Sequence, residues 1–357
     1  MRPKVSLLWV NYNSSNFKDV IEQSIESIRD LDYPNVELVA VDGCSTDDSP
    51  GYIERLLKKS GIDYKFIKQS VNLGLHSSWN VAYSAMSKKS KYFMMVNNDV
   101  NIYPNAIGEL VERMEQDERV GALNGIELRW KSDIIDHTGM MFDEMLITNA
   151  LSQGLNIKEC DREEHVISVA SSVLGIFRAS AIKKLGSKLL EEDMVRHFNE
   201  TILGARLWNA GYKILFSPIE VGEHYTKMIT ESRSPKRFYY AMRGWLTLLS
   251  ISNSPYKNSP IKDSFALKWM VNYLRTGFSF KKYKEVMKLY NGVFIDSEQK
   301  AKNLIKRKVT VDIYKMPHIK GFRYYWFLPR GLTKMVQPTK TFKELSRTES
   351  LYIPKSE

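Results

Sequence analysis

The sequence of 357 residues contains only two cysteines, Cys44 and Cys160, which are too few for a disulfide framework. It also lacks any uninterrupted apolar stretch of about 18 residues, so no membrane-spanning helix is expected. The first residues lack the long apolar core of a signal peptide, because Asn11 and Asn13 interrupt the apolar run. We therefore expect a protein of a reducing compartment, the cytoplasm.

The usual glycine-rich phosphate-binding loops are absent as well. Neither Gly-x-Gly-x-x-Gly nor Gly-x-x-x-x-Gly-Lys occurs in the sequence. If a diphosphate binds to this protein, a cation must therefore compensate much of its charge in place of a glycine-rich backbone.

The charge is unevenly distributed along a chain that is otherwise typical of a globular protein, with 43% hydrophobic and 26% charged residues. Residues 231–357 contain 26 Lys and Arg against 9 Asp and Glu, a balance of +17. Residues 1–230 contain 26 against 32, a balance of −6. This asymmetry suggests an anionic surface as partner of the second half.

Alternating strand and helix patterns over the first 130 residues predict an α/β fold with a mostly parallel, doubly wound sheet. From residue 126 to residue 165 the pattern loosens, and after about residue 226 the composition becomes basic and aromatic. We expect a domain over residues 1–226 and a mainly helical extension over residues 227–357. The predicted strands are Val5–Val10, Val36–Val41, Asp63–Ile67, Tyr92–Val96, Val120–Asn124 and Tyr212–Phe216, and predicted helices include Tyr52–Lys59, Ser77–Ser87, Ala179–Leu185 and Glu200–Ala210.

Three of the predicted strands end in small polar residues, in the segments Asn11–Asn13, Asp42–Ser45 and Asn97–Asp99. The carboxyl ends of strands form the ligand-binding edge of open α/β sheets. A carboxylate beside amide oxygens suits Mg²⁺ or Mn²⁺ carrying a diphosphate, and Asp42 could accept a hydrogen bond from a nucleotide base. Asn and Asp are also common turn formers, so an ordinary turn is the alternative at each position.

Five segments, taken in order, resemble family 2 glycosyltransferases, especially the rhamnosyltransferase-like branch. They are Val5–Asn13, Val41–Asp47, Asn72–Leu75, Val96–Asp99 and Asn209–Ile214, and the resemblance covers about residues 4–226. The resemblance implies the GT-A fold and a divalent metal, Mn²⁺ or Mg²⁺. It also implies inverting transfer of a hexosyl or deoxyhexosyl group from a nucleotide-diphosphate sugar to a hydroxyl of a glycan, glycolipid or glycoprotein.

The same resemblance assigns roles to individual residues. Asp99 is the implied metal ligand, and His224 matches a histidine that often binds the metal or the diphosphate; a solvent-facing His224 is the alternative. Asp42 would contact the donor base. The other residues implied to bind the donor are Asn11, Asn13, Asn72, Gly74, Asn97, Asn98, Ser171 and Ser172.

The general base is where the sequence departs from the family, which usually has Glu-Asp at the position of Asn199-Glu200. An inverting transfer needs a carboxylate on the face opposite the leaving diphosphate. Glu200 retains that carboxylate and is our preferred base. Asp193 belongs to a literal Glu-Asp pair, but it lies seven residues too early. A solvated helix face is the third interpretation.

Lysines and arginines alternate with Trp and Tyr in the last third of the chain, as in Lys268-Trp269 and Lys281–Lys284. This mixture suits the headgroup region of an anionic membrane. A nucleic-acid site is a less favoured alternative, and a subdomain that packs its aromatic residues on the catalytic domain is another. At the level of the whole protein, the alternatives to a glycosyltransferase are a non-catalytic nucleotide-sugar or nucleic-acid binding protein and a nucleotidyltransferase.

Overall fold

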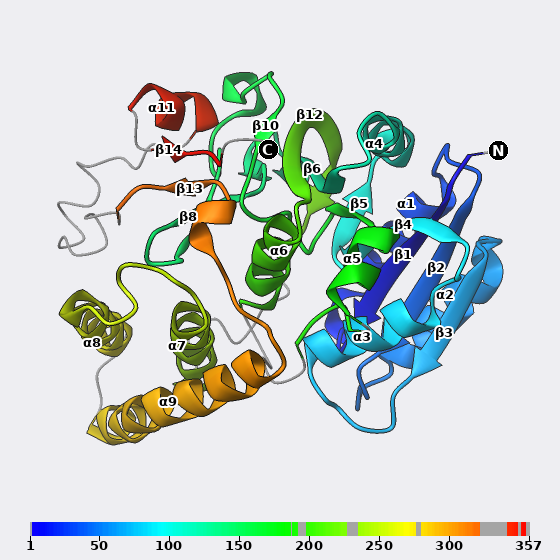
Figure 1. The fold of residues 1–357 in the computed structure, drawn as a ribbon. Helices are drawn as coiled ribbons and strands as arrows, with labels where there is room; N and C mark the ends of the chain where they lie inside the picture. Colours follow the sequence, from blue (N-terminus) through cyan, green and yellow to red (C-terminus); the bar gives the residue numbers. More distant parts are fainter. Residues whose placement is uncertain are drawn as a thin grey trace.

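A large mixed sheet forms the centre of the protein (Figure 1). The structure is a computed structural model. It describes residues 2–186, 188–191, 198–226, 235–275, 280–321, 341–348 and 351–354. The strand order is β10-β12-β6-β11-β4-β1-β2-β3, with β5 beside β12 and β7 beside β6. Strand β1 runs parallel to β2 and β4, β2 to β3, and β12 to β6. The prediction of a mostly parallel α/β sheet is therefore confirmed. Its strands are β1 (Lys4–Asn11), β2 (Val36–Asp42), β3 (Tyr64–Lys68), β4 (Ser90–Asn97), β5 (Val100–Ile102), β6 (Val120–Arg129), β7 (Ile135–His137), β10 (His165–Val166), β11 (Ile176–Arg178) and β12 (Lys213–His224).

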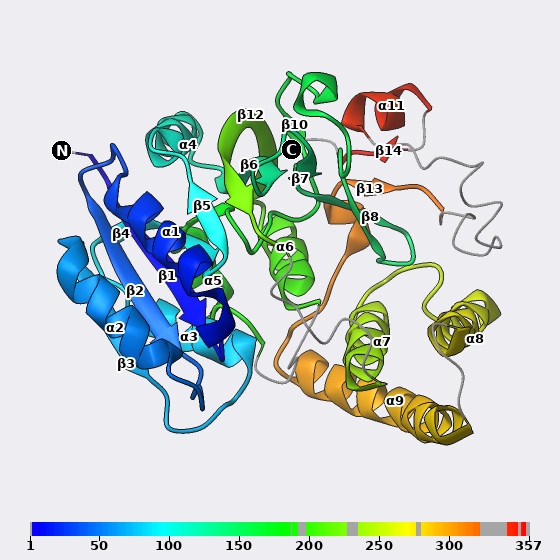
Figure 2. The same ribbon diagram turned by 180° about the vertical axis from the view of Figure 1, so that it is seen from behind.

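Helices cover both faces of this sheet. Figure 1 shows α3, α5 and α6 in front of the strands, and Figure 2 shows α1 and α2 in front of them when the molecule is viewed from behind. Apolar residues of α4 belong to the same buried cluster as those of α1 and α2. These helices are α1 (Lys18–Arg29), α2 (Ser49–Ser60), α3 (Leu75–Ala85), α4 (Ala106–Glu115), α5 (Ala179–Leu185) and α6 (Asn199–Asn209).

The apolar run Leu7–Val10 of β1 follows from this double coverage. Leu8 and Val10 belong to the cluster that includes α3 and α6, whereas Leu7 and Trp9 belong to the cluster with α1, α2 and α4. Alternate side chains of a strand point to opposite faces, so a strand buried on both faces is apolar at successive positions rather than at alternate ones. Where β1 and its neighbours leave this double cover, their sequences become polar.

Strand β12 is longer than the predicted strand over Tyr212–Phe216, because it continues through register shifts to His224. In its second half β12 lies between β6 and β5. Gly222 permits this approach: its φ is +155°, and a Cβ there would lie 2.0 Å from the carbonyl oxygen of Asn101 in β5. The extension brings His224 beside the end of β4.

The segment with a loose sequence pattern also contains strands. A second, four-stranded sheet has the order β14-β13-β8-β9, and it joins this segment to the end of the chain. The C-terminal third is helical as predicted, with β13 and β14 in addition. The elements of the C-terminal third are α7 (Pro235–Ser250), α8 (Pro260–Arg275), α9 (Phe280–Lys306), β13 (His318–Ile319), α11 (Phe342–Arg347) and β14 (Leu351–Tyr352). The other two strands of the second sheet are β8 (Met140–Asp143) and β9 (Thr148–Ala150).

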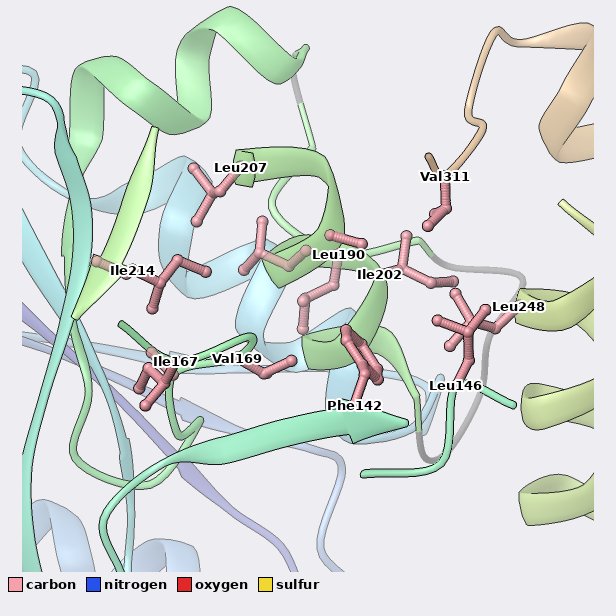
Figure 3. Packing of buried hydrophobic residues seen from close by; sticks show 14 of the residues in the cluster. Phe142, Leu146, Ile167, Val169, Leu190, Ile202, Leu207, Ile214, Leu248 and Val311 are labelled. Carbon is pink, nitrogen blue, oxygen red and sulfur yellow. The ribbon is translucent and has the colours of Figure 1, made fainter. Parts of the chain in front are cut away.

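The C-terminal helices share one buried cluster with the preceding part of the chain. Figure 3 shows Leu248 of α7 close to Leu146 and Ile202, which come from the segment after β8 and from α6. Trp245 of α7 is completely buried and donates its indole N–H to the carbonyl oxygen of Met145 at 2.7 Å. No helix among the described residues is both long enough and apolar enough to span a bilayer.

Trp245→Ala should lower the free energy of unfolding by about 3–5 kcal/mol, because the substitution opens a cavity and leaves the Met145 carbonyl without its donor. Because the two halves share a cluster, we expect one cooperative transition in urea, with the midpoint shifted for both far-UV dichroism and fluorescence. Leu267→Ala, at a side chain that is 49% exposed, is the control and should change stability by about 0.5 kcal/mol or less. Two separate transitions would contradict the shared core.

Candidate active site

The polar ends of β1, β2 and β4 meet at one edge of the large sheet. The strand register pairs Asn11 with Asp42 and Val10 with Asn97. The side chains also touch, because Asn98 donates from Nδ2 to Oδ1 of Asn11 at 2.8 Å. The three segments selected from the sequence therefore form one continuous polar edge.

Asp42 is the most enclosed group of this edge, at 2% exposure. Its Oδ1 accepts hydrogen bonds from Asn11 Nδ2 at 2.8 Å and from Ser45 Oγ at 2.6 Å. Its Oδ2 accepts one from the backbone N–H of Ser45 at 2.9 Å. A carboxylate oxygen can accept two hydrogen bonds, so Oδ2 is the atom of Asp42 with capacity left for a ligand.

Asn13 holds two loops of this edge together. Its backbone N–H donates to Ser45 Oγ at 2.9 Å, and its Oδ1 accepts from the N–H of Thr46 at 2.8 Å. Its φ of 45° lies in the left-handed region that Asn tolerates better than most residues. The segment Asn72–Gly74 forms another turn at this edge, in which Gly74 N–H donates to Asn72 Oδ1 at 2.9 Å. Both predicted segments thus have a structural function in addition to any contact with a ligand.

His224 lies between two carboxylates. Its Nε2 is 3.3 Å from Asp99 Oδ1, and its Nδ1 is 3.0 Å from Asp136 Oδ2. Burial by itself lowers the pKa of His224, but the hydrogen bonds and charges of Asp136 and Asp99 outweigh burial and raise the pKa to about 10. Burial likewise opposes ionisation of Asp136, yet its hydrogen bond to His224 lowers its pKa overall. His224 is therefore an imidazolium at neutral pH in the metal-free protein.

The backbone fixes this arrangement. Tyr225 N–H donates to the carbonyl oxygen of Asp99 at 2.8 Å, and Trp130 N–H donates to that of His224 at 3.1 Å. Val100 pairs with His224 in the sheet. The relative position of Asp99 and His224 is thus set by strands rather than by flexible loops.

The pair of Asp99 and His224 has the spacing of two metal ligands. Adjacent ligands of an octahedral ion at about 2.1 Å lie about 3 Å apart, close to the observed 3.3 Å. Asp136 on the other ring nitrogen provides the carboxylate that commonly orients a metal-bound histidine. Within the described part of the chain no group of three or more His, Cys, Asp or Glu could hold a metal ion. Unless the undescribed segments contribute, a metal at this pair would take further ligands from a substrate or from water.

Ser171 lies in the wall behind this site, at 1% exposure, and its side chain donates to Glu127 Oε2 at 3.2 Å. Glu127 is also 3.4 Å from His137 Nε2, and burial raises the pKa of its carboxyl. Ser172, the neighbour of Ser171, is partly exposed. The sequence interpretation missed Asp136 and Glu127, which both lie in the segment with a loose pattern, residues 126–165.

Glu200 is the second residue of α6 and is partly exposed. The preceding Asn199 is buried; its Nδ2 is 2.9 Å from His76 Nδ1, and its Oδ1 accepts the N–H of Glu191 at 3.0 Å. His76 belongs to the first turn of α3, just after the Asn72–Gly74 turn. The start of α6 therefore lies beside the polar edge of the sheet. Asp193 lies outside the described residues.

Glu191 anchors the chain that leads to α6. Its carboxylate contacts Arg206 of α6 at 3.0 Å and Arg307, just after α9, at 2.9 Å. Glu191 is 5% exposed, so the two arginines supply the counter-charge that a buried carboxylate needs. This double contact ties the C-terminal helices to the helix that carries Glu200.

Sequence comparison places the chain among relatives of known type. The profile of Glycosyl transferase family 2 matches residues 6–186. A poly-β-1,6-N-acetyl-D-glucosamine synthase of Staphylococcus epidermidis is 26% identical over 194 residues, which are 53% of this chain and 44% of that protein. An uncharacterized glycosyltransferase of Haemophilus influenzae is 29% identical over 121 residues, 34% of this chain and 36% of that one. The matched region thus spans less than half the length of these relatives.

Solved structures with similar folds are glycosyltransferases as well. GalNAc-T7 with UDP, GalNAc and Mn²⁺ aligns with a TM-score of 0.59 at 13% identity, covering 87% of this chain and 58% of that one. Residues 1–349 of Staphylococcus aureus TarS with UDP-GlcNAc align with a TM-score of 0.53 at 14% identity, covering 85% and 92%. At these identities the likeness establishes the fold, which is GT-A. The chain belongs to glycosyl transferase family 2.

Proposed function

We propose that this protein is a metal-dependent inverting glycosyltransferase. It transfers a hexosyl or deoxyhexosyl group from a nucleotide-diphosphate sugar to a hydroxyl of a glycan, a glycolipid or a glycoprotein. The observation that carries the proposal is the pair of Asp99 and His224, 3.3 Å apart, at the edge where β1, β2 and β4 end. A mannosyltransferase of Pyrobaculum calidifontis with a similar fold (TM-score 0.51) is known in complex with GDP-Man and Mn²⁺, and this supports the proposal.

The proposed donor site uses the polar edge of the sheet. Asp42 Oδ2 accepts a hydrogen bond from the nucleoside, while Asn11, Asn13 and Asn98 shape the pocket around it. Asn72, Gly74 and Asn97 line the same edge, and Ser172 is better placed for the donor sugar than the buried Ser171. Asp99 and His224 would hold Mn²⁺ or Mg²⁺, and the bound ion would neutralise charge on the diphosphate.

Glu200 is the proposed general base. Its carboxylate removes the proton of the acceptor hydroxyl as the hydroxyl oxygen bonds to the anomeric carbon. The bond from that carbon to the diphosphate oxygen breaks on the opposite face, and the nucleoside diphosphate leaves with the electron pair. The configuration at the anomeric carbon is therefore inverted. Asp193 is the second candidate for this role.

We also propose that the enzyme works in the cytoplasm, at the inner face of an anionic membrane, on a lipid-linked or surface acceptor. The balance of +17 over residues 231–357 and the low cysteine content support this location.

Glu200→Gln should lower the rate of sugar transfer by at least about a hundredfold, because the amide cannot accept the acceptor proton. Donor binding should be unchanged, since the proposed donor site does not include Glu200. Transfer and donor hydrolysis can be followed by release of nucleoside diphosphate from a panel of UDP, dTDP and GDP sugars. Glu112→Gln, at an exposed position of α4, is the matched control. Normal transfer in Glu200→Gln would exclude this base and favour Asp193.

Asp99→Ala should abolish the Mn²⁺-dependent binding of UDP or GDP, because Asp99 is the only carboxylate proposed to bind the ion. Calorimetric titration with and without EDTA measures this binding directly. Asp63→Ala, at a carboxylate whose side chain is 69% exposed, is the control and should bind like the unmodified protein. Binding and transfer that persist in excess EDTA would rule out the metal.

The pH dependence of stability provides a separate test of the triad formed by Asp99, His224 and Asp136. The folded-state pKa of His224 is raised to about 10 from 6.5, so its stabilising charge is complete below pH 6.5 and is lost as the pH rises towards 10. In EDTA, thermal stability should therefore fall over this range, and His224→Gln should flatten the fall. At pH 8, Mn²⁺ binding should release about one proton, measurable in buffers of different ionisation enthalpy. No proton release would show that the ion binds elsewhere.

A further inference from the structure

An exposed apolar loop lies at the edge of the sheet that carries the active site. The apolar side chains of Val71, Leu73 and Leu75 are 58%, 61% and 44% exposed to solvent. The loop follows β3, which runs parallel to β2 and β1, so it extends from the same edge as Asp42 and Asn11. Single exposed apolar residues are ordinary, but three within five residues form a patch.

Helix α9 presents a basic face on the same side of the molecule. Val286, Val293 and Leu304 of α9 are buried, and α9 packs extensively on α7. The opposite face has a row of exposed residues, which we call the lysine stripe: Lys281, Lys284, Lys288, Ile295, Lys302 and Lys306. Successive members are 3, 4 or 7 residues apart, so they lie on one face of the helix.

The lysine stripe differs from an ordinary solvated helix face. Ile295 in its middle is 72% exposed, the highest value among the large hydrophobic residues described. Glu285, Asp296 and Glu298 flank the stripe, and Glu298 contacts Lys302 at 2.8 Å, but α9 as a whole carries seven lysines against these three carboxylates. At 1.5 Å per residue its 27 residues extend over about 40 Å.

The loop and α9 lie on one side of the protein. Figures 1 and 2 differ by a rotation about the vertical axis, and in both views α9 and the loop that precedes α3 lie along the lower edge. Arg307, just after α9, contacts Glu191, which leads to the helix of Glu200. The basic helix therefore begins far from the active site and ends beside it.

We propose that this side of the protein docks on an anionic lipid bilayer. The lysine stripe binds the headgroups, and the Val71–Leu75 loop and Ile295 enter the interface between headgroups and acyl chains. Lysines at such a surface attract anionic lipid, and exposed aliphatic side chains gain from burial in it. The active-site edge then faces the membrane. This inference deepens the proposed function and rests on it only for the nature of the acceptor.

Flotation of the purified full chain with vesicles tests the docking surface without reference to catalysis. The protein should float with vesicles of phosphatidylcholine and phosphatidylglycerol, should bind phosphatidylcholine alone weakly, and should lose binding as salt is added. Lys281→Glu, Lys284→Glu and Lys288→Glu combined should lower the bound fraction at least about tenfold. Val71→Ser combined with Ile295→Ser should lower the fraction that remains bound at high salt.

Two matched variants control for net charge and apolar surface. Lys315→Glu, Lys320→Glu and Lys343→Glu make the same charge change at exposed lysines near β13 and in α11, away from the lower edge in Figure 1. Ile353→Ser removes a side chain that is 49% exposed near β14. Both should float like the unmodified protein. Absence of flotation, or equal losses in the stripe and control variants, would overturn the proposal.

A change of oligomeric state in the stripe variants, with unchanged flotation, would instead show that a second copy of the chain covers this face. Sugar transfer to a soluble acceptor separates the docking proposal from the proposed function. It should be unaffected by the lysine substitutions if the docking surface is distinct from the catalytic groups. Absence of transfer by the unmodified protein, with intact flotation, would count against the proposed function alone.

Discussion

The site depends on the compensation of charge around His224. Asp99 and Asp136 are both buried, and two carboxylates this close to each other and to Glu127 are costly unless a cation lies between them. In the metal-free protein the protonated imidazole supplies that cation. A divalent ion at Asp99 would take over this function, and His224 would then bind it as a neutral ligand with its other nitrogen still on Asp136. The same three side chains would then compensate charge both with and without the proposed ion.

This compensation links parts of the chain that are far apart in sequence. Asp99 follows β4, Asp136 belongs to β7 and His224 ends β12. Gly222 allows β12 to approach β5 closely enough for His224 to reach Asp99. On the other side of the site, Glu191 joins α6 to the end of α9 through Arg206 and Arg307. The C-terminal helices thus contribute to the position of α6 as well as to the shared core.

The sequence predicted the strands that are covered by helices on both faces. Strands β1, β2 and β4 are apolar at successive positions because both of their faces are covered, and their polar ends meet at one edge of the sheet as expected. The short strand β7 was not predicted, since three residues cannot establish a periodicity. Asp136 was missed for that reason, although it contacts His224 directly. The boundary near residue 226 and the roles of Glu200 and Asp193 stay predictions.

The metal pair also constrains how the donor and the ion bind. If Asp99 and His224 bind the ion as proposed, they supply two ligands, whereas Mg²⁺ and Mn²⁺ prefer six. Among the described residues no third His, Cys, Asp or Glu joins this pair, so diphosphate oxygens and water would complete the coordination there. An ion that arrives with the nucleotide sugar already has phosphate ligands, and it loses fewer waters on binding. Weak affinity for the free ion and stronger affinity for the ion with its donor follow from this geometry. The protein would then distinguish a loaded donor from free nucleotide or free metal, because only the combination completes the coordination and displaces the proton of His224.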